Sequence, residues 1–293
     1  MRPSCCFLLD SSENVRTFLE LVEKVLIFEK SDFNKITLMK KYTLYGLAAL
    51  ISVLTSCGGP STTETKLHVI FDNPAPRTMS LALFGEVSED LVSSLQIADG
   101  IPSSVSVMLL EKDGQQLLFD AGNGNADSQL LPELQELGFI PADIDAIFIT
   151  HLHGDHIGGL MKDGQPVFTQ AKLYIPSVEL DAWMQDAKVQ ALVAAYGENV
   201  VKFALDDALP CGVQAIAAYG HTPGHTLYLA DDKLIAGDIM HGVALQLEHP
   251  EFCARYDMDK EAAIASRKTI IEQVKQQGWT MYGMHFPTKD GVK

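Results

Sequence analysis

The stretch HLHGDH, residues 151–156, decides how this chain folds and what it binds. It places three imidazoles and one carboxylate, all able to bind a metal ion, within six residues. His151 and His153 follow the apolar run 146–150, and in extended backbone both side chains would point to the same side. Gly154 then lets the chain turn, which brings in the carboxylate and the third imidazole. Neither a solvated surface nor an ordinary core explains four such groups at this spacing, so the sequence predicts a metal site.

Three later stretches carry further side chains that can bind a metal. GHTPGH at 220–225, AGD at 236–238 and GMHFP at 283–287 each follow an apolar run with the composition of a strand. Functional groups typically stand on loops at the ends of strands, where a rigid scaffold positions them. The four stretches together therefore predict a single site.

Short apolar runs alternate with helical patterns from Lys66 onward, with Gly and Pro between them. The expected strands are Met79–Phe84, Val105–Leu110, Gln116–Phe119, Ala146–Thr150, Leu173–Ile175, Val213–Ala218, Leu227–Leu229, Lys233–Ala236 and Trp279–Met284. The expected helices are Ser128–Leu137, a helix capped by Ser177, and Asp259–Gln277, with Gly138 and Gly278 as stops for the first and last. Strands flanked by helices, without an internal repeat, indicate a layered α/β domain.

Composition excludes some classes of protein. The net charge of −16 repels phosphate backbones, so no nucleic-acid partner is expected. The five cysteines show no CxxC spacing, which argues against a zinc ribbon and against a disulfide scaffold. We expect Cys211 and Cys253 to be buried small side chains and not a disulfide bridge.

The N-terminal part resembles a bacterial lipoprotein signal. In residues 39–57, lysines precede an uncharged run of about 15 residues, shorter than the roughly 20 that a spanning helix needs. The run ends in LTSC, which is similar to a lipobox with Cys57 as the lipidated residue. Residues 58–66 read as a flexible tether, and residues 1–38 as an upstream extension that is not native. The prediction is a hydrolase domain at 67–293, lipid-anchored at Cys57 in the bacterial cell envelope; the alternative is a buried N-terminal helix.

The order HxHxDH, GHTPGH, GD and a late histidine resembles the metallo-β-lactamase superfamily, over about residues 67–287. The resemblance implies an αββα sandwich, in which two packed mixed β-sheets carry helices on their outer faces.

The resemblance also implies the roles of individual residues. The first metal would be held by His151, His153 and His221, the second by Asp155, His156 and His285, and Asp238 would bridge both. Asp155 would also carry a proton to the leaving group. Asp120 and His225 would lie behind the ligands and orient them. Trp183 would line the substrate pocket, with ordinary core packing as its alternative, and the sequence leaves open whether His241 faces the pocket or the solvent.

The predicted ligands are all imidazoles and carboxylates. This set suits two Zn²⁺ ions, although Mn²⁺, Fe²⁺ or Co²⁺ can occupy such sites. Two ions that share a water lower its pKa, and the resulting bridging hydroxide attacks a carbonyl carbon or a phosphorus. The resemblance therefore predicts a dinuclear metal-dependent hydrolase.

The finer resemblance is to the branch of methyl parathion hydrolase and the quorum-quenching lactonases. Class B β-lactamases lack the bridging aspartate, so Asp238 disfavours lactam hydrolysis. The loop 121–127 has no aromatic residue where methyl parathion hydrolase has one, which weakens the case for aryl phosphotriesters. We expect a small-molecule lactone or ester as substrate. The alternatives are a phosphotriester, phosphoester or thioester hydrolase and a non-catalytic metal-binding lipoprotein, and the oligomeric state, a homodimer included, stays open.

Overall fold

The computed structural model describes residues 65–293. The extension at 1–38, the lipoprotein-type signal at 39–57 with Cys57, and nearly all of the tether at 58–66 lie outside these residues. Among the described helices, none combines the length and the apolar character needed to cross a membrane.

The first sheet has six strands in the order β1-β4-β5-β6-β9-β10. They are β1 (Lys66–Phe71), β4 (Ser106–Lys112), β5 (Gln115–Phe119), β6 (Ala146–Phe148), β9 (Lys172–Pro176) and β10 (Val200–Phe203). β1, β4 and β5 pair antiparallel, and β5, β6, β9 and β10 pair parallel. All three residues of β6 are buried, as is typical of a parallel strand that is covered on both faces.

The second sheet has four strands in the order β11-β12-β13-β14. They are β11 (Gln214–Ala217), β12 (Thr226–Ala230), β13 (Lys233–Ile235) and β14 (Thr280–Tyr282). The first three pair antiparallel, whereas β14 pairs parallel to β13, so these two strands end at the same edge of the sheet. Near the chain end, Val292 adds an antiparallel bridge to Met281.

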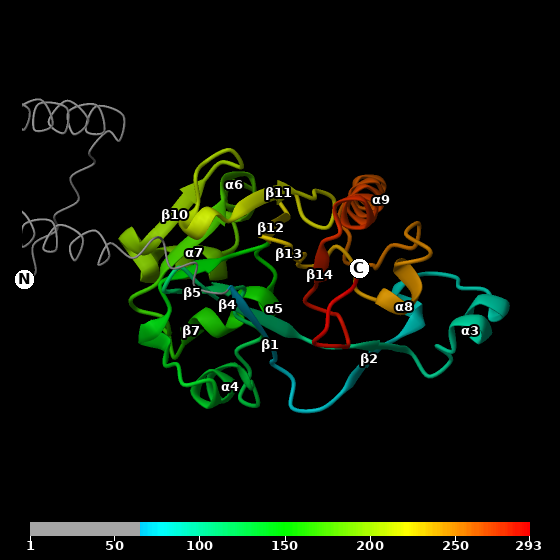
Figure 1. Ribbon diagram of the computed structural model, residues 1–293, viewed down its shortest axis with the longest axis horizontal. Coiled ribbons are helices and arrows are strands. Elements are labelled where there is room, and N and C mark those ends of the chain that lie inside the picture. Colours follow the sequence, from blue (N-terminus) through cyan, green and yellow to red (C-terminus); the bar gives the residue numbers. More distant parts are fainter. Residues whose placement is uncertain (1–64) are drawn as a thin grey trace, which may run out of the picture. The chain divides into compact units, whose positions relative to one another are not determined.

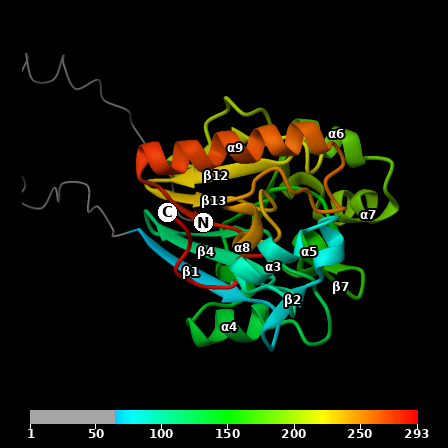
Figure 2. The same ribbon diagram turned by 90° about the vertical axis from the view of Figure 1, so that its right-hand side faces the viewer.

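The two sheets pack face to face around buried aromatic rings. Phe119 and Phe148 of the first sheet stack with centroids 5.2 Å apart, and Tyr228 of the second lies 5.3 Å from Phe148. Helices α4 (Leu130–Glu136), α6 (Ser177–Trp183) and α7 (Ala187–Tyr196) pack on the outer face of the first sheet. Helix α9 (Lys260–Gln277) covers the second sheet, as Figure 1 and Figure 2 show from two sides. The predicted αββα sandwich is confirmed.

Helix α9 forms where the sequence predicted it. The Asp259 side chain accepts a hydrogen bond from the backbone N–H of Ala262, which caps the first turn. Gly278 ends the helix in the left-handed conformation, with φ of 71°. Ile270, Ile271 and Val274 face the second sheet.

A small lobe stands beside the sandwich and corrects one prediction. It comprises β2 (Arg77–Met79), α3 (Glu89–Leu95), β3 (Ile101–Ser103) and α8 (Val243–Gln246), packed around Phe84, Ile97, Ile101 and Leu245. The strand expected at Met79–Phe84 is wrong, because Leu81–Leu83 forms a 3₁₀ turn. The hydroxyl of Ser80 accepts from the N–H of Ala82 and starts this turn, and the leucines then pack into the lobe.

Short elements complete the described part of the chain. They are α5 (Gly154–Ile157), β7 (Met161–Lys162), β8 (Gln165–Pro166) and the 3₁₀ turns Pro141–Asp143, Gly158–Leu160, Gly197–Asn199 and Pro210–Gly212. Ser177 is the first residue of α6 and not its cap, because Pro176 holds the cap position. Cys211 and Cys253 are free thiols, as expected, but both are only half-buried.

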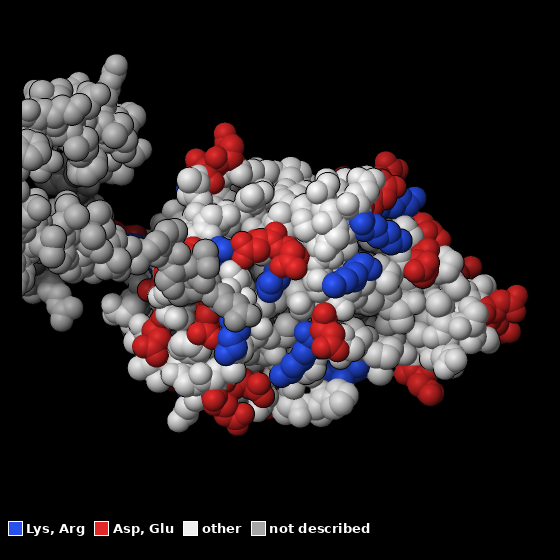
Figure 3. Space-filling view, in the orientation of Figure 1, with Lys and Arg blue, Asp and Glu red and all other residues white. Residues whose placement is uncertain are grey.

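Charged side chains of both signs are scattered over the visible surface. On the face drawn in Figure 3, Lys and Arg side chains lie interspersed with Asp and Glu side chains. Acidic side chains project at the end of the molecule that carries α3.

Candidate metal centre

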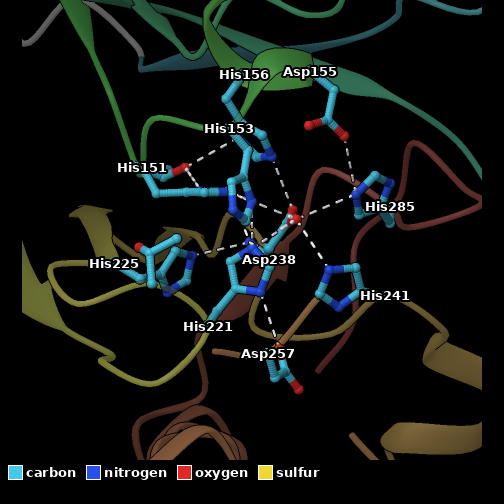
Figure 4. Close-up of polar contacts among 12 residues, drawn as sticks. His151, His153, Asp155, His156, His221, His225, Asp238, His241, Asp257 and His285 are labelled. Carbon is cyan, nitrogen blue, oxygen red and sulfur yellow. Dashed lines mark hydrogen bonds and ion pairs between the residues drawn. The ribbon is translucent and has the colours of Figure 1, made fainter. Parts of the chain in front are cut away.

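The predicted ligands come together at one edge of the sandwich. The chain leaves β6 and passes through His151 and His153 into α5, which carries Asp155 and His156. The other three predicted ligands stand on the loops that follow β11, β13 and β14. Figure 4 shows the cluster with Asp238 at its centre. The structure thus joins side chains that are up to 134 positions apart in the sequence, from His151 to His285.

Three imidazole nitrogens form a tight triangle. His151 Nε2 lies 2.9 Å from His153 Nδ1, and His221 Nε2 lies 3.1 Å and 3.0 Å from these two atoms. Nitrogens that bind one tetrahedral zinc at 2.0–2.1 Å stand about 3.3 Å apart. The triangle therefore has nearly the dimensions of a zinc site.

Asp238 joins this triangle to a second group. Asp155, His156 and His285 converge beside it, with His285 Nε2 3.6 Å from Asp155 Oδ2. Asp238 Oδ1 lies 3.1 Å from His156 Nε2, and Asp238 Oδ2 lies 3.4 Å from both His221 Nε2 and His285 Nε2. One carboxylate therefore contacts imidazoles of both groups, which is the arrangement that a bridging ligand requires.

The burial of these groups tests whether they fit metal ions. His151 and His156 are 0% exposed and Asp238 is 3% exposed. His156 Nε2 and Asp238 Oδ1 are buried, and although they lie 3.1 Å apart, neither forms a hydrogen bond within the described part of the chain. Buried polar atoms are nearly always satisfied, so these atoms call for a partner that the protein itself does not supply. Imidazole and carboxylate donors at these separations fit divalent cations such as zinc.

The protonation states of His151, His221 and Asp238 suit cation binding. Burial and the neighbouring imidazoles hold the pKa of His151 well below its usual value, and burial lowers the pKa of His221 to about 4. Both rings are therefore neutral at pH 7 and keep a lone pair for a metal. Although burial raises the pKa of Asp238, the surrounding imidazoles, led by His285 and His156, lower it well below its usual value. The central carboxylate is therefore ionised. Burial lowers the pKa of His156 and His285, but Asp238 raises the pKa of both above its usual value, so a metal must displace a proton from these two rings.

Asp120 lies behind His156, where the sequence analysis expected an orienting group. Its Oδ2 accepts a hydrogen bond of 2.7 Å from His156 Nδ1. Its two oxygens also accept from the backbone N–H and the hydroxyl of Thr150, each at 2.8 Å. The carboxylate fixes the ring so that Nε2 faces the centre of the cluster.

His225 stands behind Asp238. Its Nδ1–H donates to the carbonyl oxygen of Ala218, and its Nε2 accepts from the backbone N–H of Asp238, both at 3.0 Å. Burial lowers the pKa of His225 to about 3, so the ring stays neutral and both bonds persist at pH 7. His225 therefore anchors the backbone of the central carboxylate instead of joining the ligand groups.

Two further charged residues support His221, and the sequence analysis did not assign them to the site. Asp257 Oδ1 accepts from His221 Nδ1 at 3.0 Å, and Asp257 Oδ2 accepts from Arg267 Nη2 at 3.0 Å. Arg267 is 1% exposed and also donates to the carbonyl oxygen of Ile239, next to Asp238. The Arg267 guanidinium thus holds in place both Asp257, which contacts His221, and the backbone of Ile239, which follows Asp238. One feature of the sequence could have pointed to Arg267. It is a charged residue on the apolar face of α9, four positions after Ala263 and three before Ile270.

Glu179 connects the loop that carries His151 and His153 to the loop that carries His221. Its Oε1 accepts from the backbone N–H of Leu152 at 3.0 Å, and its Oε2 accepts from the hydroxyl of Thr222 and the N–H of Gly224, both at 2.8 Å. The carboxyl group is fully buried, and burial raises its pKa. A Cβ at Gly224 would overlap the backbone of Glu179, so the loop can approach this closely only with glycine there.

Replacing Glu179 by alanine should lower the free energy of unfolding by about 3 kcal/mol or more, because three buried donors lose their acceptor. Denaturant unfolding of the metal-free protein measures this change. Glu198→Ala, an exposed carboxylate next to α7, is the matched control and should stay within about 0.5 kcal/mol of the parent protein. Equal stability of the Glu179 and Glu198 variants would contradict this role.

Trp183 and His241 line the cluster. The Trp183 ring stands edge-on to His153 with centroids 5.4 Å apart, and it also packs against the core of the first sheet. Trp183 therefore packs against the core and stands beside a predicted ligand, and its place in a substrate pocket stays a prediction. His241, which the sequence did not place, is buried against Asp238 and does not face the solvent.

The fold and this clustered arrangement define a class of protein with a metal centre at the edge of a β-sandwich. The sequence profile of the metallo-beta-lactamase superfamily matches residues 100–273, more than half of the chain. The chain belongs to the metallo-beta-lactamase superfamily.

Curated relatives match over shorter stretches. The hydroxyacylglutathione hydrolase of Xanthomonas campestris pv. campestris (strain B100) is 31% identical over 132 residues, which are 45% of this chain and 44% of that protein. The ribonuclease Z of Salinibacter ruber is 43% identical over 72 residues, which are 24% of this chain and 21% of that protein. The chain thus matches less than half the length of these relatives.

Solved structures match over most of the described chain. AidC, a dizinc quorum-quenching lactonase in complex with a product, superposes with a TM-score of 0.71 at 23% identity, over 80% of this chain and 92% of that one. The hydrolase AbOPH superposes with a TM-score of 0.70 at 24% identity, over 79% and 90%. At these identities the likeness concerns the fold alone.

Proposed function

We propose that this protein is a metal-dependent hydrolase with a dinuclear centre, and that it opens a lactone or cleaves an ester. The observation that carries the proposal is the position of Asp238, whose carboxylate contacts imidazoles of two separate groups. His151, His153 and His221 would hold one ion, Asp155, His156 and His285 the other, and Asp238 both. When bound, two zinc ions would lower the pKa of water towards neutrality and polarise the oxygen of the substrate.

The side chains around the centre would divide the remaining work. Asp120 and Asp257 hold the rings of His156 and His221 in place, and His225 holds the backbone of Asp238. Asp155 has a side chain that is 30% exposed, more than that of Asp238 or His285, so it can reach a substrate. We assign its carboxylate the task of passing a proton to the leaving oxygen.

The choice of substrate class rests on the neighbours of similar fold. AidC is a lactonase, and a second neighbour holds the product N-hexanoyl-L-homoserine at its catalytic metal centre. A thioester hydrolase is the second candidate, because a hydroxyacylglutathione hydrolase is among the curated relatives. Zinc-loaded protein should be assayed with an acyl-homoserine lactone, a p-nitrophenyl ester, a p-nitrophenyl phosphotriester and a hydroxyacyl-glutathione thioester. If the zinc-loaded protein hydrolyses none of these four substrates, the proposal is refuted.

Removal of the metals should abolish hydrolysis reversibly. Dialysis against a chelator should take away two equivalents of metal and nearly all activity, and added Zn²⁺ should restore both. Since ligands that bind only the folded state stabilise it, by about 2.7 kcal/mol at a hundredfold excess over Kd, the metal-free protein should also melt at a lower temperature. Metal analysis, activity and thermal unfolding on the same samples check this. Full activity at one equivalent of metal would contradict the dinuclear centre.

A further inference from the structure

Ser104 is a buried residue without a task in the site as described so far. It lies between β3 and β4, is 3% exposed, and stands 181 positions before the predicted ligand His285. Its carbonyl oxygen accepts a hydrogen bond of 2.9 Å from His285 Nδ1. The other nitrogen, Nε2, then faces Asp238 and Asp155, as Figure 4 shows. The Ser104 carbonyl therefore fixes the ring in the orientation in which Nε2 can bind a metal.

The residues on both sides of His285 are also tied to this segment. The Ser104 hydroxyl lies 2.6 Å from the carbonyl oxygen of Phe286 and 3.2 Å from that of Met284, so its proton goes mainly to Phe286. The carbonyl oxygen of Met284 accepts from the backbone N–H of Ser106 at 2.8 Å. The hydroxyls of Ser106 and Ser104 lie 2.7 Å apart, and since each has one proton, Ser106 donates to Ser104 here. Residues 104–106 thus hold the chain before and after the ligand.

Hydrogen bonds matter for this loop because packing beside it is incomplete. Phe286 is buried in the core of the second sheet. A cavity of about 370 Å³, however, borders Ser103, Ser104 and Pro287. Atoms that border a cavity lack packing partners on that side, so the chain there can shift at little cost once a hydrogen bond is lost. The Ser104 hydroxyl therefore restrains the loop where side-chain packing does not.

His285 differs from other predicted ligands in how it is held. The Nδ1 atoms of His156 and His221 contact side-chain carboxylates, whereas that of His285 contacts a backbone carbonyl. The direction of that carbonyl follows the local backbone, which the Ser104 hydroxyl helps to hold. The loops of the first metal group are connected by Glu179 instead. Loss of the Ser104 hydroxyl should therefore affect the second metal group and spare the first.

We propose that Ser104 is a positioning residue for the second metal. Its hydroxyl, through Phe286, and its carbonyl oxygen, through Nδ1, hold His285 where Nε2 can bind the ion that Asp155 and His156 also hold. Ser104 thereby raises the affinity for this ion and leaves the affinity for the first ion unchanged. This inference rests on the proposed function, since it requires a dinuclear centre.

The test measures the affinity for each of two Zn²⁺ ions by competition with a chromophoric chelator. The metal-free parent protein is compared with Ser104→Ala, which removes the hydroxyl and keeps the carbonyl, and with Ser104→Thr, which keeps both. Tyr196→Phe is the matched control, because it also removes a buried hydroxyl that donates to a backbone carbonyl, that of Leu160 at 3.1 Å. Circular dichroism and thermal unfolding of the metal-free variants report on the fold.

Ser104→Ala should bind one of the two ions about 10- to 100-fold more weakly and the other as the parent protein does. Ser104→Thr should restore the lost affinity, and Tyr196→Phe should bind both ions normally even if it unfolds at a lower temperature. In a His285→Ala background, Ser104→Ala should weaken metal binding no further, since the side chain that it positions is gone.

Three results would overturn the inference: unchanged affinities in Ser104→Ala, equal weakening of both ions, or a further loss in the His285→Ala background. These affinities are measured without substrate, so the failure of the proposed function is seen separately. A parent protein that binds two ions but hydrolyses nothing refutes the proposed function alone, and the affinities still judge Ser104. A parent protein that binds fewer than two ions overturns the inference as well.

Discussion

Asp238→Ala should abolish hydrolysis while the protein stays folded. The side chain contacts imidazoles of both predicted metal groups, so its loss removes the carboxylate that joins them. A metal centre contributes several kcal/mol to transition-state stabilisation, and about 4 kcal/mol corresponds to a factor of roughly 10³ in rate. We therefore expect kcat/KM to fall about a thousandfold or more, and bound metal to fall below two equivalents.

The fold should tolerate this change because no backbone group depends on the side chain. Among the described residues, Asp238 Oδ1 forms no hydrogen bond, and the anchor at this position is the backbone N–H that donates to His225. Circular dichroism and thermal unfolding of the metal-free variant check the fold, and Asp206→Ala, an exposed aspartate, is the matched control. Near-normal turnover by Asp238→Ala would refute the dinuclear centre.

Much of the fold could be predicted because local patterns and long-range packing agree. Helix α9 has a capping aspartate, a periodic apolar face and a glycine stop, and it forms between these signals. β6 is a continuous apolar run and becomes a buried central strand. The run 79–84 is equally apolar, but it turns at Ser80, because packing in the lobe around Phe84 and Ile101 prevails over its strand-like composition.

The centre was predictable only where spacing along the chain carries information. HLHGDH can be recognised from the sequence alone because four side chains able to bind a metal stand within six residues. The later predicted ligands each follow a strand. The groups that support these ligands are single residues on distant elements. Glu179 on α6 and Arg267 on α9 look like ordinary charged residues of a helix, and only the folded chain shows that both are buried. The position of His241 could not be predicted either, since the side-chain oxygen of Gln246 holds its backbone in place.

Replacing Arg267 by methionine should be among the most destabilising single changes in the described part of the chain. The guanidinium is buried and donates to Asp257 and to the carbonyl oxygens of Ile239, Pro250 and Phe252. Removing one partner of a buried ion pair leaves the other charge uncompensated, which typically costs about 3–5 kcal/mol. Denaturant unfolding of the metal-free protein should show this loss. Lys268→Met, an exposed neighbour on α9, should stay within about 0.5 kcal/mol of the parent protein.

The double variant Asp257→Asn/Arg267→Met separates the ion pair from general damage to packing. Although burial raises the pKa of Asp257, the hydrogen bond from His221 and the nearby positive charges lower it below its usual value, so the carboxylate is ionised and needs Arg267. With that charge removed as well, the double variant should lose less stability than the sum of the two single variants, by about 1–3 kcal/mol. Asp257→Asn alone should also weaken metal binding about 10- to 100-fold, because His221 loses the carboxylate that orients it. Strictly additive losses would show that the two side chains are not coupled as an ion pair, and unchanged metal affinity in Asp257→Asn would show that Asp257 does not support the centre.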